Sequence, residues 1–409
     1  MTRFSKLLIA SLTLPSAALA LSACTTESSG CTVTLTPSAD DQTAANRAFV
    51  SARSGDTVCF APGTYTYSDP IEARMLTDFT VRGLGATAND VLLDFRGQSA
   101  GAKGLSFTAM TDLLIENLTV ENASADDIFV SSTTGVTFRD VRAGWSDDIP
   151  MDSRGRYAIY PVESTNVVIE DSEAYGSSDA GIYVGQTTNC IVRNSIARGN
   201  VAGIEIENST NCEVYGNTAS GNTGGVLVFE LPTVPRNGAS TEVHDNVIND
   251  NNVPNFAAEG TIISFLPVGT GVMVLAANDV EIHDNTIQGN TSVAVLAVSY
   301  QTAELAGAPM AREPMYEPHL EQLWVYGNTT ARNSSMPTPL LNALAGAGPY
   351  PDVLWDGRVR PGMDPSSVCV AMTTLRDLDL ETMRPVTTDD VSMHTCTRTS
   401  RAPVVIASR

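Results

Sequence analysis

The chain has 409 residues, of which 43% are hydrophobic and only 17% charged, and 46 acidic side chains stand against 24 basic ones. So few charged residues argue against coiled coils and helix bundles. The formal charge of −22 excludes a sequence-independent nucleic-acid binder, which needs a basic face, and it opposes binding of polyanionic sugars and anionic lipids.

Residues 1–23 have the pattern of a lipoprotein signal peptide. Basic residues precede an apolar run, and Leu21-Ser22-Ala23-Cys24 resembles a bacterial lipobox, whose cysteine is acylated and becomes the mature N-terminus. The alternative is an ordinary secreted protein, cleaved near Ala23 and not lipidated. We therefore expect an exported lipoprotein, at the outer membrane or cell surface, that contacts the membrane only through lipid on Cys24. Residues 24–40 would form the anchor and a linker.

Six further cysteines remain, and an even number in an exported chain suggests disulfides. No Cys-x-x-Cys or Cys/His cluster occurs, which disfavours structural zinc and covalent haem. Fifteen pairings exist in principle. The spacing favours Cys31–Cys59, Cys190–Cys212 and Cys369–Cys396.

The middle of the chain contains a repeat of about 22 residues. Its asparagines Asn166, Asn189 and Asn211 lie 23 and 22 residues apart, each followed by a short alternating run. Such a unit has two or three strands and no helical pattern, so it can bury its apolar side only against copies of itself. The repeat therefore predicts an all-β right-handed parallel β-helix over 41–333. Its coils should stack about 4.8 Å apart.

Stacking predicts columns of equivalent residues along the solenoid. The inward column should be Ile115, Phe138, Ile169, Val192, Val214, Val243, Ile282 and Val325. The next position should point outward and begin with alternating charges, which keeps like charges apart. Its members are Glu116, Arg139, Glu170, Arg193, Tyr215, His244, His283 and Tyr326. The three repeat asparagines should form an amide ladder at a buried turn.

The ends of the repeat region have a different composition. Residues 41–52 have helical composition and could cap the first coil, which would protect its open edge. After about Asn333 the repeat stops. Residues 334–409, rich in Pro, Ser and Thr, are then a C-terminal extension or cap closed by Cys369–Cys396.

These features resemble the pectin-lyase-like superfamily of right-handed β-helices. Within it, the segments 178–186, 201–208, 222–232 and 269–273 are similar to a family of exported parallel β-helix repeat proteins, often lipoproteins, without an established function. The resemblance spans roughly 40–333 and implies a co-exported partner protein, but no reaction. The motif sets of polygalacturonases and alginate epimerases are absent, and a lysine base could come only from Lys103.

Acidic residues gather around one predicted turn. Asp126 and Asp127 precede one strand, Asp179 precedes another, and an insertion between them carries Asp147, Asp148 and Asp152 with Arg154 and Arg156. Adjacent coils should bring these residues to a shared edge. There they could bind calcium through Asp126, Asp127 and Asp147, or provide acid–base groups. The alternative is that these aspartates only cap turns and that their charges are solvated, without a functional role.

A second candidate is an outward column next to that edge. Tyr160, Tyr183 and Glu205 should line it, with Leu227 and Met273 farther along. Tyrosines beside carboxylates suit sugar rings, which stack on aromatic faces. The alternative is a column covered by the insertions 231–240 or 250–270. Glu207, at an inward or corner position, and Glu230 are further substrate-binding candidates.

His244 and His283 share one repeat position, where they either bind a metal or simply occupy a surface ladder.

The leading hypothesis is a lipid-anchored cell-envelope protein that binds or processes a carbohydrate. In an enzyme, an acid and a base would come from Asp148, Asp152, Asp179 or Glu205, and Arg154 or Arg156 would stabilise negative charge. Tyr160, Tyr183, Glu207 and Glu230 would bind the glycan. Calcium is the one cofactor considered. The alternative is a non-catalytic scaffold that docks the co-exported partner.

Overall fold

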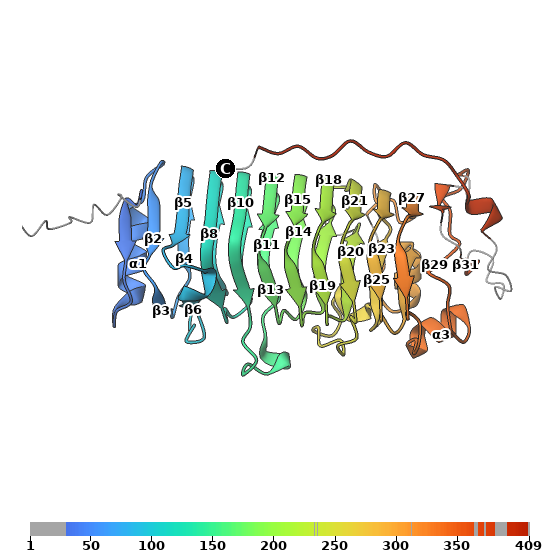
Figure 1. The fold of residues 1–409 in the computed structure, drawn as a ribbon, viewed down its shortest axis with the longest axis horizontal. Helices are drawn as coiled ribbons and strands as arrows, with labels where there is room; N and C mark the ends of the chain where they lie inside the picture. Colours follow the sequence, from blue (N-terminus) through green and yellow to red (C-terminus); the bar gives the residue numbers. More distant parts are fainter. Residues whose placement is uncertain are drawn as a thin grey trace, which may run out of the picture.

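The computed structural model describes residues 30–407 apart from 233, 235, 312, 364–366, 372–373 and 381–390. The predicted signal peptide and the acylated Cys24 lie outside these residues. In the described part, each strand pairs in parallel with its equivalent one coil earlier, for example β12 (Thr165–Glu170) with β10 (Thr134–Gly144). The coils stack into an elongated solenoid, viewed from the side in Figure 1. The predicted right-handed parallel β-helix is confirmed.

Each complete coil gives one strand to each of three faces, here called sheets I, II and III. Strands β8 and β10 bend and contribute to both sheet I and sheet II. Sheet I contains β1 (Val33–Leu35), β2 (Thr57–Phe60), β5 (Thr77–Gly83), β8 (Thr111–Glu121), β10, β12, β15 (Thr188–Arg193), β18 (Thr210–Tyr215), β21 (Ala239–His244), β24 (Asn278–His283), β27 (Glu321–Tyr326) and β30 (Cys369–Val370).

Most strands of sheet II are shorter than most strands of sheet III. Besides β8 and β10, sheet II contains β3 (Gly63–Thr66), β6 (Val91–Asp94), β13 (Glu173–Tyr175), β16 (Ile196–Arg198), β19 (Thr218–Ser220), β22 (Val247–Asn249), β25 (Thr286–Gln288) and β28 (Thr329–Ala331). Sheet III contains β4 (Ile71–Arg74), β7 (Lys103–Thr108), β9 (Asp126–Ser131), β11 (Tyr157–Val162), β14 (Ala180–Gly185), β17 (Ala202–Glu207), β20 (Gly224–Phe229), β23 (Thr270–Leu275), β26 (Val293–Val298), β29 (Val353–Trp355) and β31 (Leu375–Asp377).

The predicted columns of sheet I are confirmed. Every member of the inward column, from Ile115 to Val325, is fully buried, and neighbours in the column are paired across adjacent strands. The outward column has the expected charge alternation, because Arg139 pairs with Glu116 and with Glu170, and Arg193 pairs with Glu170. Strand alternation alone therefore places these side chains correctly.

The asparagine ladder differs from its prediction. Asn166, Asn189 and Asn211 do form a hydrogen-bonded series, with Nδ2–Oδ1 distances of 2.9 and 2.7 Å, but they lie at the surface rather than at a buried turn. Their backbones adopt the left-handed conformation, which asparagine tolerates well. The buried amide ladders belong to two other turns. They comprise Asn200, Asn222, Asn251, Asn290 and Asn333, and Asn217, Asn246, Asn285 and Asn328.

Helix α1 (Asp41–Ser51) covers the N-terminal end of the solenoid, as the composition of this segment predicts. Its Phe49 packs against Phe60, Phe79 and Phe107 with ring centroids 6.0 to 6.4 Å apart. The helix therefore supplies apolar contacts that a further coil would otherwise provide.

The C-terminal boundary of the solenoid lies beyond the predicted position. Strands β29, β30 and β31 extend sheets III and I past Asn333. Long insertions separate these strands, so the sequence period disappears although the pairing continues. The last described residues then turn back over sheet I, as the red segment of Figure 1 shows. There Arg401 pairs with Asp279, and the backbone N–H of Val404 donates to Glu213.

Insertions cover the outer face of sheet III from β20 onward. They include α2 (Tyr300–Leu305) and α3 (Pro339–Ala345), and their apolar residues form a second core with Leu227, Met273 and Leu296. Within the described part of the chain, no helix combines the length and apolarity needed to cross a membrane.

Candidate functional site

Three carboxyl groups come together on the outer face of sheet III, just before the insertions begin. The register pairs Tyr183 of β14 with Glu205 of β17, and Gly185 with Glu207. The intervening residues of both strands point into the core, so these positions point outward. Glu207 was expected at an inward or corner position, and the register corrects this. Asp179, directly before β14, joins the group.

Three tyrosines lie over these carboxyl groups. The ring of Tyr157 lies 4.3 Å from that of Tyr160 and 4.8 Å from that of Tyr183, and the last two are 4.9 Å apart. Tyr183 is buried, whereas Tyr157 and Tyr160 are half-buried. A Cβ at position 185 would lie 2.4 Å from the Tyr183 ring, so Gly185 gives that ring its place. The cluster therefore has a buried side and a side open to solvent.

Hydrogen bonds connect the tyrosines to the acids. The hydroxyl of Tyr157 donates to Oδ2 of Asp179 over 3.0 Å, and Nε2 of Gln186 donates to Glu207 over 3.0 Å. Glu205 and Glu207 are also hydrogen-bonded to each other. Oε2 of Glu205 has no hydrogen-bond partner among the residues that the structure describes, although Glu205 is only 2% exposed. An unpaired buried oxygen is costly, which makes it a ready acceptor or donor for a ligand.

Burial changes the proton affinity of all three acids. It raises the pKa of Asp179 to about 7 and that of Glu207 to about 7. It raises the pKa of Glu205 well above its ordinary range, and the nearby charges of Asp179 and Glu207 add to the effect. Near neutral pH the cluster thus contains both protonated and ionised carboxyl groups. This is the condition for paired acid and base action.

A small basic edge borders the cluster. Lys103 of β7 pairs in register with Asp126 of β9, and its Nζ lies 2.9 Å from the centre of the Phe129 ring. Exposed Arg156 approaches the buried Asp126, with 3.7 Å between Nη2 and Oδ1. Burial raises the pKa of Asp126 to about 6, although both cations oppose this. Lys103 could not be placed here from the sequence, because only the strand register brings it beside Asp126.

The other predicted catalytic residues lie apart from this cluster. Asp148 bonds to Arg96 over 2.6 Å and to Ser146 over 2.7 Å. Arg154 lies 3.9 Å from the exposed Asp147, and Asp152 contacts its neighbour Ser153. The shared edge predicted for all six aspartates therefore contains only Asp126 and Asp179, because the insertion folds onto its own loop and Arg96.

The proposed calcium ligands do not converge in the described residues. Asp126 faces Arg156, whereas Asp127 is fully buried and accepts a hydrogen bond from the backbone of Ala123. Asp147 extends into solvent. Consecutive strand residues point to opposite sides, so Asp126 and Asp127 cannot face one ion from a regular strand.

Glu230 fastens parts of the covering insertions to sheet III by hydrogen bonds. Its Oε2 accepts a hydrogen bond from the backbone of Gly238 over 2.6 Å, and its own carbonyl accepts one from Tyr316 over 2.7 Å. Burial raises the pKa of Glu230 to about 7. These contacts hold Gly238 and Tyr316 against the end of β20.

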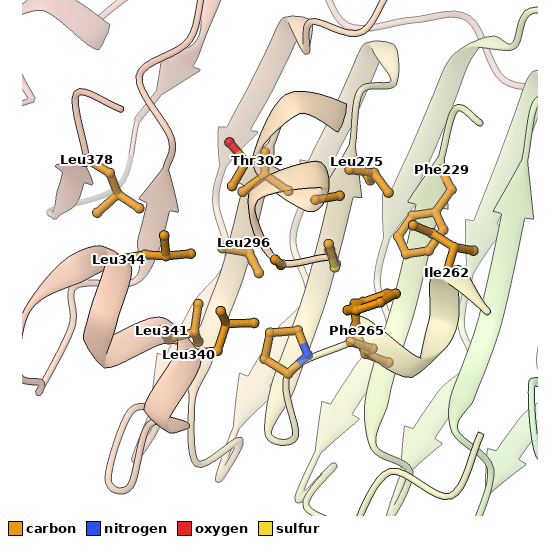
Figure 2. A pocket seen from close by; sticks show the side chains of 16 residues that line it. Phe229, Ile262, Phe265, Leu275, Leu296, Thr302, Leu340, Leu341, Leu344 and Leu378 are labelled. Carbon is orange, nitrogen blue, oxygen red and sulfur yellow. The ribbon is translucent and has the colours of Figure 1, made fainter. Parts of the chain in front are cut away.

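An apolar pocket lies between the insertions and sheet III. Figure 2 shows its lining, which includes Phe229, Phe265, Leu296, Leu341 and Leu378. Among the described lining residues, the one polar side chain is that of Thr302. Sugars need several hydrogen-bonding groups, so this pocket is less suited to them than the tyrosine–carboxyl cluster.

The three predicted disulfides are all present. They join Cys31 to Cys59, Cys190 to Cys212 and Cys369 to Cys396, with Cα–Cα distances of 5.8, 4.5 and 5.6 Å. The second joins the same position of two adjacent coils, as the register shows. Three disulfides are typical of exported proteins, which mature in oxidising compartments.

The coil geometry, the stacked columns and the three parallel sheets define a right-handed β-helix protein. The profile of the family described as "Right handed beta helix region" matches residues 89–234 and 151–307, which together exceed half of the chain. The chain therefore belongs to this family. No curated protein sequence matches it.

Two solved structures that are similar to this chain are a polygalacturonase and an epimerase module. A polygalacturonase from Erwinia carotovora ssp. carotovora aligns with a TM-score of 0.52 and 12% identity, covering 83% of this chain and 96% of that one. The A-module of the Azotobacter vinelandii mannuronan C-5 epimerase AlgE6 aligns with a TM-score of 0.48 and 17% identity, covering 83% and 89%. At these identities the likeness to the polygalacturonase concerns the fold alone.

Proposed function

We propose that this protein binds a carbohydrate on the outer face of sheet III, at the cluster of Tyr157, Tyr160, Asp179, Glu205 and Glu207. The observation that carries the proposal is the pairing of partly exposed tyrosine rings with a carboxyl cluster in which Oε2 of Glu205 has no hydrogen-bond partner among the described residues. Tyrosine faces stack on sugar rings, and carboxyl groups bond their hydroxyls.

The charge of the chain narrows the class of glycan. With a formal charge of −22 the protein repels polyuronates. We therefore propose a neutral glycan as the ligand, rather than the uronic polymer after which a polygalacturonase is named. Lys103 and Arg156 add a local basic edge that suits a single acidic substituent. Anchoring through lipid on Cys24 would place this face at the cell envelope.

The same acids support processing of the bound glycan. A protonated Glu205 could donate a proton and an ionised Asp179 or Glu207 could accept one, which is the pairing that glycosidic bond chemistry requires. Binding and turnover are therefore expected at one site.

The test is a panel of neutral and uronic polysaccharides incubated with purified protein, with bound and newly formed oligosaccharides both followed. We expect binding of a neutral glycan that Tyr160→Ala weakens by about tenfold, as loss of one stacking contact predicts. Tyr215→Ala, which removes a half-buried ring on sheet I, is the matched control. Products that disappear in Glu205→Gln while binding persists would establish catalysis. Absence of any binding, or equal binding by Tyr160→Ala and wild type, would refute the proposal.

A further inference from the structure

A second cluster of ionisable residues lies on the outer face of sheet I, on strands β18, β21 and β24, whereas the tyrosine–carboxyl cluster lies on sheet III. It arises from two nearly identical segments, Glu242-Val243-His244-Asp245 and Glu281-Ile282-His283-Asp284. In each, the glutamate and the histidine are two residues apart, so both point outward. The preceding coil contributes Glu213, which pairs in register with Glu242.

The histidines reach back to the glutamates of the preceding coil. Nε2 of His244 lies 3.0 Å from Oε1 of Glu213, and Nε2 of His283 lies 2.7 Å from Oε1 of Glu242. The two imidazoles are parallel, with centres 5.0 Å apart. Glu213, Glu242 and His244 form one triad, and Glu242, Glu281 and His283 form a second. Within each triad the candidate ligand atoms all lie within 4.8 Å of one another.

The second nitrogen of each imidazole also faces a carboxylate. Nδ1 of His244 lies 2.8 Å from Asp245, and Nδ1 of His283 lies 2.9 Å from Asp284. A neutral imidazole has only one N–H, so it can donate to only one of its two carboxylates. If Nδ1–H donates to the aspartate, the lone pair of Nε2 points at a glutamate oxygen. A cation that replaces the proton, with both atoms moving slightly apart to become its ligands, removes the conflict.

We propose that each triad binds one Zn²⁺ ion and that Glu242 is a ligand of both ions. One imidazole nitrogen and two carboxylate oxygens per ion match zinc, and a water can complete a tetrahedral shell. Asp245 and Asp284 would orient the histidines through Nδ1, as carboxylates commonly do for metal-bound histidines.

Burial and the C-terminal segment favour this assignment. The glutamate side chains are only 6 to 11% exposed, which makes their uncompensated charge costly. The returning C-terminal segment crosses them, with Val404 bonded to Glu213 and Arg401 near Glu281 at 3.8 Å. Among the described ion pairs, the guanidinium of Arg401 approaches Glu281 and Asp279 but neither Glu213 nor Glu242, so a cation at the triads would add positive charge where carboxylates gather.

The test is calorimetric titration of metal-stripped, untagged full-length protein with Zn²⁺. We expect a Kd below about 10 µM, and at least a tenfold loss of affinity in Glu242→Gln, which removes the shared ligand. His319→Asn is the matched control, because His319 also contacts a carboxylate, that of Glu317, but belongs to neither triad. Circular dichroism checks that each variant is folded.

A second measurement keeps the proposal testable if Glu242→Gln does not fold. His244→Asn and His283→Asn each remove one triad, and Co²⁺ in place of zinc should give the visible absorption of a low-coordinate site in wild type, reduced in either variant. A Kd above about 10 µM in wild type, or unchanged affinity in the glutamate and histidine variants, would mean that the cluster is only an imidazolium–carboxylate ladder. Either result would overturn the proposal.

Discussion

The hydroxyl of Tyr157 donates a hydrogen bond to Oδ2 of Asp179, 3.0 Å away, although 22 residues separate them in the chain. The bond favours the ionised carboxylate and partly offsets the burial that raises the pKa of Asp179 to about 7. The tyrosine that we propose as a stacking surface for a sugar therefore also affects the proton affinity of Asp179.

Tyr157→Phe should raise the pKa of Asp179 further, by about one unit, because the ionised form loses its donor. Carboxyl resonances followed by NMR against pH would measure the change, and Tyr215→Phe on sheet I should leave it unaltered. A pKa that stays the same or falls in Tyr157→Phe would contradict this reading of the hydrogen bond.

The acid cluster should make the protein less stable as the pH rises from about 5 to 7. Asp179 and Glu207 have folded-state pKa values of about 7, above the ordinary values of 3.8 and 4.5. Between these limits the folded state retains protons that the unfolded state has released, so the free energy of unfolding falls with pH and levels off at about pH 8, where the folded-state groups are ionised. The loss should be on the order of 4 kcal/mol, roughly half of it from each group.

Urea unfolding at pH 5, 6, 7 and 8 would measure this slope. Glu207→Gln should flatten it, because the amide does not titrate, whereas Glu163→Gln at an exposed position should not. A wild-type stability that rises between pH 5 and 7 would show that other groups dominate.

The buried asparagine ladder should contribute more to stability than the surface one. Asn222 bonds to Ala197 and Asn251 and accepts from Asn200, so Asn222→Ala leaves several buried groups unpaired and should cost about 2 to 4 kcal/mol. Asn189→Gly removes a surface ladder member without straining its left-handed backbone, and should cost less than about 1 kcal/mol. Chemical denaturation of both variants provides the comparison, and equal losses would disprove the difference.

The inward column of sheet I should be the most sensitive to truncation. Ile169→Ala empties space in the core and should lower the free energy of unfolding by about 2 to 5 kcal/mol. Ile196 is 43% exposed on sheet II, so Ile196→Ala should cost less than about 1 kcal/mol. The same denaturation assay measures both, and a small loss in Ile169→Ala would show that the column is not tightly packed.

The candidate site was only partly predictable. Tyr183 and Glu205 were placed in one column because they occupy equivalent positions of adjacent repeats, and the register confirms this. The sequence predicts Asp148 at an edge shared with Asp126 and Asp179, because adjacent coils should bring their segments to the same turn. The structure instead bonds it to Arg96, which precedes it by 52 residues. Insertions have no repeat to fix their register, so their side chains could not be located from spacing.

The sequence by itself determined the solenoid, its stacked columns and the Cys190–Cys212 pair, because residues one repeat apart must meet when identical coils stack. The spacing of the other four cysteines indicated the remaining two disulfides. Tertiary structure alone decided which outward residues are buried. The insertions cover Leu227 and Met273 but leave Tyr157 and Tyr160 partly open, and the returning C-terminal segment covers Glu213. Burial and charge neighbours set the proton affinity of a carboxyl group, and both depend on contacts between segments that share no period.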